Sequence, residues 1–182
     1  MTHYTMDIAG LTRSLPLFPV GAIQIAGFVM FGDVEITQAA AGALLDKAPA
    51  FDCLLTSEAK SIPLAYEMSR MSGKKYFVAR KGLKAYMKDV VSCPVKSITT
   101  ASMQMLYVDG SDAAAMKGKR ILIVDDVVSM GATLTALNEL AENVGGTVCG
   151  QMAVLAEGDA AKRDDITFLA PLPLFDQEGN VL

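Results

Sequence analysis

The stretch that decides the fold reads Ile121-Leu122-Ile123-Val124-Asp125-Asp126-Val127-Val128-Ser129-Met130-Gly131-Ala132-Thr133. Its first four residues are apolar and uncharged, which is typical of a strand buried on both faces of a parallel sheet. A short loop follows, and we expect a helix from Ala132 to about Asn143, closed by a glycine pair at 145–146. A buried strand, a loop and a helix in this order form the repeating unit of an α/β domain.

Further strands and helices alternate on both sides of this unit. Short apolar runs predict strands at 53–55, 76–78, 147–155 and 166–169. One helix is expected from Thr37, as its capping residue, to about Ala48, and another from Ser61 to Gly73 with a proline in its first turn. Residues 81–108 lack helical periodicity, so we expect an extended hairpin or a mobile loop there. The alternation predicts one α/β domain over 1–182, with a doubly wound, mainly parallel sheet.

The composition is apolar for a water-soluble protein. The chain has 182 residues, of which 52% are hydrophobic and 20% charged, and its mean hydropathy is +0.34. These values exclude disorder as the main state. The longest uncharged run, residues 14–32, approaches the length of a membrane span. It contains two prolines and three glycines, however, so we expect buried strands or a folded N-terminal lobe there and no membrane helix.

The cysteine and histidine content argues against several kinds of site. The three cysteines are far apart, no Cys-x-x-Cys pair occurs, and His3 is the single histidine. A zinc site or a Cys/His catalytic pair therefore has almost no material. No cationic start leads into an apolar run with a cleavage site, so no secretory signal is expected. We expect free thiols and a cytoplasmic location.

The formal net charge of -4 hides a strong internal asymmetry. Residues 1–69 carry -4, residues 70–120 carry +8 and residues 121–182 carry -8. The overall charge argues against a basic nucleic-acid-binding protein. The cationic middle third is either a solvated surface or a site for a polyanion, and the charge pattern alone leaves both open.

The deciding stretch also carries the chemistry. In an open α/β sheet, ligands bind beyond the carboxyl ends of the strands, and a helix N-terminus there offers N–H groups to a phosphate. The adjacent Asp125 and Asp126 would repel a phosphate, so we expect them to hold the hydroxyls of a ribose. A phosphate-loop nucleoside triphosphatase is excluded because no Gly-Lys-Ser/Thr sequence occurs. A response-regulator receiver is excluded because its acidic pair lies near the start of the domain. The pattern therefore favours a sugar phosphate.

Residues 121–133 resemble the 5-phosphoribosyl-1-pyrophosphate signature of the type I phosphoribosyltransferases, and among these the adenine enzymes are the most similar. Ser57-Glu58-Ala59-Lys60 resembles their pyrophosphate loop, and Arg80-Lys81 resembles their Arg-Lys pair. Residues 168–175 are similar to their closing strand. The resemblance implies a small N-terminal hood at 1–36, a core at 37–175 and a flexible loop at 82–108. It also implies a homodimer.

The same resemblance implies a role for each site residue. Asp125 and Asp126 would be catalytic and hold the ribose. The 5-phosphate would bind to Ser129, Met130, Gly131, Ala132 and Thr133. The pyrophosphate would bind to Ala59, Lys60, Arg80, Lys81 and Lys84. Ala22, Ile23 and Gln24 are the candidates for base contacts. Mg²⁺ would be carried by the phosphoribosyl pyrophosphate, with no direct protein ligand expected. The partners would be this sugar donor and a nucleobase, without nucleic acid or membrane.

Some positions depart from the family pattern. Met130 stands where the family has Thr or Gly, and Lys60-Ser61 replaces the commoner Arg-Gly. Residues 102–107 contain no carboxylate, although the adenine enzymes carry one there, and the hood lacks their Arg-Asp pair. The implied activity is transfer of the phosphoribosyl group to a purine-like base, adenine in the first place, giving a nucleoside monophosphate and pyrophosphate. The alternative is a non-catalytic regulatory protein that binds phosphoribosyl pyrophosphate or a nucleotide.

Overall fold

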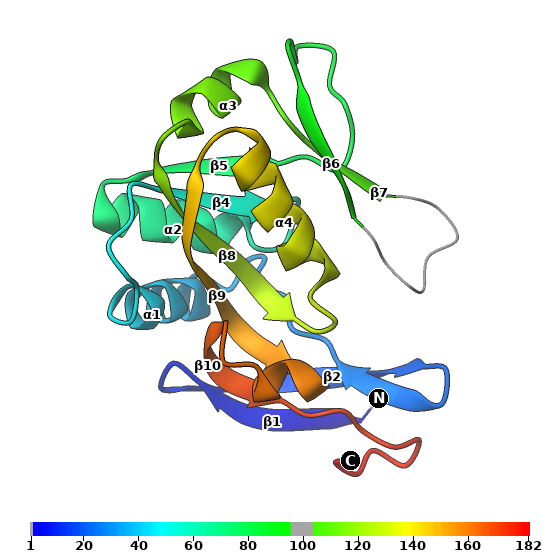
Figure 1. Ribbon diagram of the computed structural model, residues 1–182. Coiled ribbons are helices and arrows are strands. Elements are labelled where there is room, and N and C mark those ends of the chain that lie inside the picture. The colour runs from blue at the N-terminus through cyan, green and yellow to red at the C-terminus, as the bar shows by residue number, and fades with distance from the viewer. Residues whose placement is uncertain (1, 96–103) are drawn as a thin grey trace.

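A five-stranded parallel sheet forms the centre of the computed structural model, which describes residues 2–95 and 104–182 (Figure 1). Its strands lie in the order β10-β9-β8-β4-β5, and every neighbouring pair is parallel. Their bounds are β4 Cys53–Ser57, β5 Lys75–Ala79, β8 Arg120–Val128, β9 Thr147–Glu157 and β10 Thr167–Leu172. The predicted α/β class and parallel sheet are confirmed.

Helices cover both faces of this sheet (Figure 1). Helices α1 (Val34–Leu45) and α2 (Ile62–Ser72) pack on one face, and α4 (Ala132–Asn143) packs on the other. Along β8, Ile121 and Ile123 join the core under α4, whereas Leu122 and Val124 join the core under α1 and α2. The strand is therefore buried on both faces, as its uninterrupted apolar run predicted.

The N-terminal residues form a separate three-stranded antiparallel sheet, made of β1 (His3–Ile8), β2 (Leu11–Val20) and β3 (Ile23–Ala26). This three-stranded sheet, called the hood below, lies at one end of the molecule (Figure 1). The uncharged run 14–32 thus becomes strands and the loop after them. Among the described residues, no helix has the length and apolar character needed to cross a membrane.

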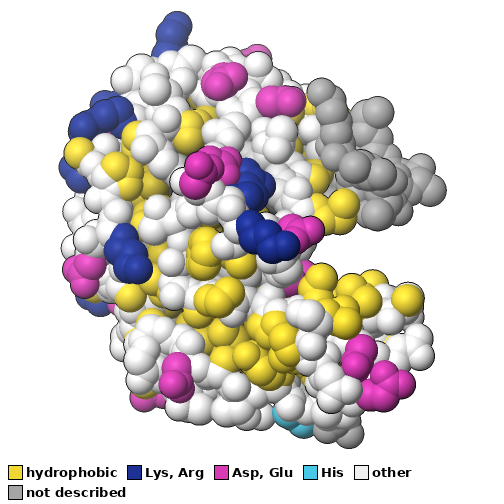
Figure 2. Space-filling model, turned by 60° about the horizontal axis from the view of Figure 1, so that its bottom comes forward, with side chains coloured by type: hydrophobic (Ala, Val, Ile, Leu, Met, Phe, Trp, Pro, Cys, Tyr) yellow, Lys and Arg dark blue, Asp and Glu magenta, His cyan; other side chains and the backbone are white. Residues whose placement is uncertain are grey.

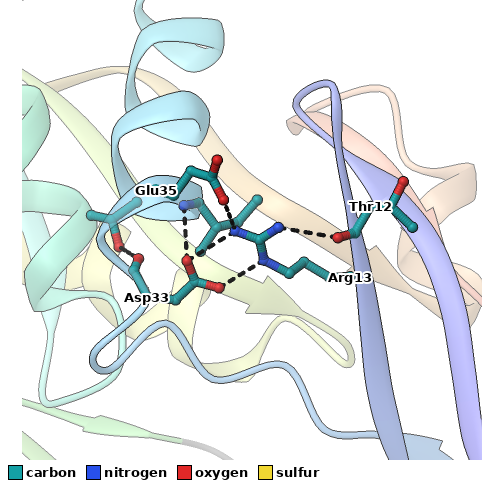
Figure 3. Close-up of polar contacts among 6 residues, drawn as sticks. Thr12, Arg13, Asp33 and Glu35 are labelled. Atoms are coloured by element: carbon teal, nitrogen blue, oxygen red, sulfur yellow. Dashed lines mark hydrogen bonds and ion pairs between the residues drawn. The ribbon is translucent and has the colours of Figure 1, made fainter.

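An ion-pair cluster fastens the hood to the first helix (Figure 3). The guanidinium of Arg13, on β2, donates to both carboxylate oxygens of Asp33 at 2.7 and 3.0 Å, and to Glu35 at 2.8 Å. Asp33 is also the N-cap of α1, where its Oδ1 accepts from the Ile36 N–H. One carboxylate therefore starts the helix and holds the hood against it.

A hairpin occupies part of the segment expected to be a flexible loop. Strands β6 (Val91–Val95) and β7 (Gln104–Val108) are antiparallel, and β6 packs beside α4. The hairpin prediction is confirmed for these described strands, while residues 96–103 lie outside the described residues. The segment 102–107 lies partly there: only its last four residues, in β7, are described.

Several element boundaries differ from the predictions. Helix α1 begins at Val34, not after Thr37, because Asp33 supplies the cap; the Thr37 hydroxyl donates instead to the Asp33 carbonyl. Ser61 precedes α2 but makes no side-chain cap, since its hydroxyl lies against the Ser57 carbonyl. Helix α2 ends at the left-handed Gly73, as predicted. Two short elements were not predicted, namely α3 (Gly110–Met116) and the 3₁₀ helix η1 (Gly158–Lys162).

Candidate active site

The two adjacent carboxylates lie near the carboxyl end of β8 and are almost fully buried. Asp125 is 7% exposed and Asp126 is 5% exposed. The Asp126 N–H donates to Asp125 Oδ1 at 3.0 Å, so the two residues lie side by side at this point of the strand. Asp125 lines a cavity on the α4 side. Asp126 meets Lys60 on the other side, with 2.9 Å between Oδ2 and Nζ.

The two buried carboxyl groups are unusual in their pKa and in their hydrogen-bond partners. Burial raises the pKa of Asp125 to about 7, and the neighbouring charge of Asp126 adds to the effect. Asp126 Oδ2 has no hydrogen-bond partner among the described residues apart from its ion pair with Lys60. Buried carboxylate oxygens with so few protein partners are available to accept from the hydroxyls of a ligand.

The loop of residues 129–133, called the phosphate loop below, lies between β8 and α4. Gly131 is the N-cap of α4, with φ at +77° and no side-chain cap. The first N–H groups of the helix are therefore left for a ligand. This loop lines a cavity of about 260 Å³ together with Asp125, Val95 and Gln104. Met130 is 64% exposed, so its side chain adds no polar group to the loop.

The residues predicted to bind pyrophosphate lie on the other side of Asp126, around the loop 57–60 at the end of β4. This region is called the pyrophosphate side below. The carboxylate of Glu58 accepts from the guanidinium of Arg80 and from the backbone N–H of Lys81, both at 2.8 Å. Arg80 also donates to the Tyr86 hydroxyl. The structure thus brings Ala59, Lys60, Arg80 and Lys81 together, while Lys84 is an exposed residue further along the same segment.

A buried hydroxyl link joins this loop to the acidic strand. Thr56 Oγ1, on β4, donates to the Val124 carbonyl at 2.8 Å and lies 2.7 Å from Ser61 Oγ. Both hydroxyls are at most 1% exposed. The link fixes the loop beside the residue that precedes the acidic pair. It was not predicted, because it depends on the neighbouring positions of β4 and β8 in the sheet.

The hood residues proposed for base contacts lie at the β2–β3 turn and on β3. Residues 22 and 23 are partly accessible, and the backbone of Gln24 pairs with Phe175. The side-chain amide of Gln24 donates to the carbonyls of Asp176 and Gln177 at 3.1 and 2.8 Å. These two bonds hold the C-terminal segment against β3, and a base contact by residues 22–24 stays a prediction.

One carboxylate at the same end of the sheet was not predicted. Glu157 ends β9 and is partly buried. Burial raises its pKa, and the nearby charge of Lys60 acts in the opposite direction. Figure 2 shows a notch in this end of the molecule, bordered by hydrophobic side chains on one side and by Lys, Arg, Asp and Glu side chains on the other.

Comparisons with known proteins agree with this geometry. The model of the phosphoribosyl transferase domain family matches residues 34–170. An adenine phosphoribosyltransferase of Mycobacterium avium is 30% identical over 92% of this chain and 89% of its own length. A hypoxanthine/guanine phosphoribosyltransferase of Methanosarcina mazei is 35% identical, over 59% of this chain and 53% of its own length.

Solved structures show the same fold at lower identity. The adenine phosphoribosyltransferase of Thermoanaerobacter pseudethanolicus superposes with a TM-score of 0.72 at 19% identity, covering 86% of this chain and 95% of that one. The Saccharomyces cerevisiae enzyme, solved in complex with adenine and an imino-altritol bisphosphate, gives 0.70 at 16% identity over 92% and 94% of the two chains.

Proposed function

The chain belongs to the phosphoribosyl transferase family, and we propose that it transfers the phosphoribosyl group of 5-phosphoribosyl-1-pyrophosphate to adenine. The products are a nucleoside monophosphate and pyrophosphate. The proposal rests on one observation, a row of polar groups at the carboxyl ends of the central strands. The phosphate loop, the buried Asp125 and Asp126, and the cations Lys60 and Arg80 follow one another there. A phosphate, a sugar and a pyrophosphate occur in the same order in the proposed donor.

In the proposed reaction, the cations on the pyrophosphate side bind the leaving pyrophosphate. As the bond from the sugar C1 to the pyrophosphate oxygen breaks, negative charge grows on that oxygen, and Lys60 and Arg80 stabilise it. Lys60 is half exposed and paired with Asp126, so it can turn toward a bound pyrophosphate. That movement frees the Asp126 carboxylate for the ribose hydroxyls. Asp125 and Asp126 then also stabilise the positive charge that develops on the sugar ring.

Magnesium is proposed to enter with the sugar donor. Carboxylate oxygens suit this hard cation, and the sparsely partnered Asp126 Oδ2 is such a donor beside the pyrophosphate side. When bound, the ion neutralises the charge of the pyrophosphate. Pyrophosphate and ribose oxygens would be its main ligands, with Asp125 and Asp126 close by.

A homodimer in the cytoplasm is the proposed state of the protein. Apolar side chains stay exposed around the start of α1 and on α2, among them Phe31 at 55%, Val34 at 64% and Tyr66 at 55%. A second copy would bury them. The three cysteines form no disulfide among the described residues, which fits a reducing compartment. Sedimentation equilibrium of the purified chain tests the dimer, and a monomer at micromolar concentration would overturn it.

The activity test measures pyrophosphate release from phosphoribosyl pyrophosphate and Mg²⁺ with adenine, guanine, hypoxanthine, xanthine, orotate or uracil. We expect release with adenine above the other bases. Release with guanine or hypoxanthine alone would overturn the choice of base. No release with any base, combined with tight binding of the sugar donor, would favour a regulatory protein over an enzyme.

The double variant Asp125→Asn/Asp126→Asn tests the site itself. We expect turnover to be abolished because the ribose hydroxyls lose both carboxylates, while the far-UV circular dichroism stays unchanged. The control is Asp46→Asn/Glu142→Gln, which removes two carboxylates at the C-terminal ends of α1 and α4, away from the site, and should keep full turnover. Turnover by the first variant at the wild-type rate would contradict the assignment.

A further inference from the structure

The phosphate loop carries no charged side chain, although its cavity includes a carboxylic acid. Residues 129–133 are Ser, Met, Gly, Ala and Thr, and Asp125 lines the same cavity. A sugar 5-phosphate is close to a dianion at neutral pH. Helix N–H groups bind such an anion, but a cation beside them would offset the charge of the carboxylates.

Arg163, from a distant part of the chain, places a cation against Gly131 of this loop. It follows η1, between Ala160 and Ile166, which are 2% and 5% exposed and belong to the same core as Leu134 of α4. These two buried neighbours anchor the segment beside the start of α4. A Cβ atom placed on Gly131 would overlap Nη1 of Arg163. Only a glycine at 131 therefore lets the guanidinium lie against the phosphate loop.

Asp165 fixes the orientation of this guanidinium. Nε donates to Asp165 Oδ1 at 2.9 Å and Nη2 donates to Oδ2 at 2.7 Å, a two-bond fork that leaves the Nη1 edge turned toward Gly131. Within the described part of the chain, Nη1 has no hydrogen-bond partner of its own. The ion pair also raises the pKa of Arg163, so the side chain keeps its charge at any pH of interest.

We propose that Arg163 is a positioning residue of the 5-phosphate site: oriented by Asp165, it holds the phosphate loop at Gly131 and adds the positive charge that the loop lacks. The inference rests on the proposed function, because the ligand is the 5-phosphate of the sugar donor. It predicts a selective effect. Ligands with a 5-phosphate should depend on Arg163, whereas pyrophosphate, which binds on the other side of Asp126, should not.

Calorimetric titration of Arg163→Gln with ribose 5-phosphate and, separately, with pyrophosphate and Mg²⁺ tests this. We expect the affinity for ribose 5-phosphate to fall about tenfold, the loss of one charge-assisted contact, and the affinity for pyrophosphate to stay within twofold. Arg163→Lys should recover most of the loss because it restores the charge. The salt dependence of ribose 5-phosphate binding should also be weaker in Arg163→Gln than in the wild type.

Each other outcome counts against the proposal. Unchanged ribose 5-phosphate affinity in Arg163→Gln would overturn it. An equal loss for both ligands, or a loss in Arg163→Lys as large as in Arg163→Gln, would reduce Arg163 to a structural residue without a charge effect. Failure of the wild-type chain to bind either ligand would overturn the proposed function, and this inference with it. Lys162→Gln, which removes an exposed cation one residue away, should leave both affinities unchanged.

Discussion

The two ends of the candidate site offer an anion different kinds of donor. At the phosphate loop, backbone N–H groups at the start of α4 face the cavity and the side chains are neutral. At the pyrophosphate side, the donors are long cationic side chains, each already paired with an acid: Lys60 with Asp126 and Arg80 with Glu58. One end is rigid and sparsely charged. The other is charged and held in place by partners that a substrate must displace.

This difference fits the different fates of the two anions. The 5-phosphate stays on the sugar from substrate to product, so a fixed backbone cradle serves it throughout. The pyrophosphate leaves, and the charge on its bridging oxygen grows as the bond breaks. Cationic side chains that exchange a carboxylate partner for the pyrophosphate can follow that change. The predictions below separate the two ends.

The largest effect is expected at the pyrophosphate side. Arg80→Met should lower kcat/KM for phosphoribosyl pyrophosphate by about 100-fold or more, because the leaving group loses a donor positioned by Glu58. Steady-state pyrophosphate release measures it. Arg70→Met is a control, since Arg70 is also paired with a glutamate, Glu67 on α2, away from the site. A comparable loss in both variants would show that the effect is not local.

At the phosphate loop, the space beside Gly131 should also matter. Gly131→Ala places a methyl group on Arg163 Nη1 at a φ of +77°. We expect the free energy of unfolding to fall by about 2 kcal/mol, with weaker binding of ribose 5-phosphate. Gly118→Ala is the control, because it has a φ of +70° but open space around it, and should cost only about 1 kcal/mol. Urea denaturation measures both variants. Equal losses of unfolding free energy in Gly131→Ala and Gly118→Ala would mean that the contact with Arg163 does not contribute to the effect.

Asp125, which lies between the two ends, should reduce stability at neutral pH. Its pKa is raised to about 7 in the folded chain, against about 3.9 when unfolded. Between these values the folded state binds more protons, so the free energy of unfolding falls as pH rises from about 4 to about 7. Asp125→Asn should therefore be more stable than the wild type by roughly 1–3 kcal/mol at pH 8 and equal to it near pH 3.

Urea denaturation of Asp125→Asn and of the wild type, at about pH 8 and about pH 3, tests this prediction. Asp46→Asn serves as the control and should show no such pH-dependent gain. A lower stability of Asp125→Asn at pH 8 would mean that the carboxylate is held by favourable contacts that outweigh its burial.

The smallest effect is a gain at the phosphate loop. Met130→Thr places a hydroxyl where the loop has only an exposed thioether, and it should tighten ribose 5-phosphate binding about two- to fivefold. Pyrophosphate binding should not change. Met71→Thr, at a similarly exposed position on α2, controls for general effects of the substitution. Looser binding in Met130→Thr would indicate that the methionine itself contacts the ligand.

The sequence predicts best what local chemistry determines. The buried β8, the helix from Ala132 to Asn143 and the place of the acidic pair follow from an apolar run, a loop of small and hydroxyl residues and a helical period. The start of α1 could not be predicted reliably, because Asp33 and Thr37 are both good caps. Asp33 prevails in a structure where Arg13, from another strand, also holds its carboxylate.

The missed parts of the site have a common cause. The pairing of Lys60 with Asp126, the Thr56 link to Val124 and the approach of Arg163 to Gly131 all join segments that are distant in sequence. Their positions depend on the strand order β9-β8-β4, which the residue pattern does not specify. The resemblance to a family named most of the residues, but the partners of each residue come from the structure.

The pairing of Gln24 with the segment at 175–177 also has a consequence for biosynthesis. These residues lie at least 151 positions apart, so β3 cannot gain its neighbour until that segment has left the ribosome. At about 5–20 residues per second, the hood strands wait roughly 10–30 seconds with an open edge. The hood is thus among the first segments made and among the last completed.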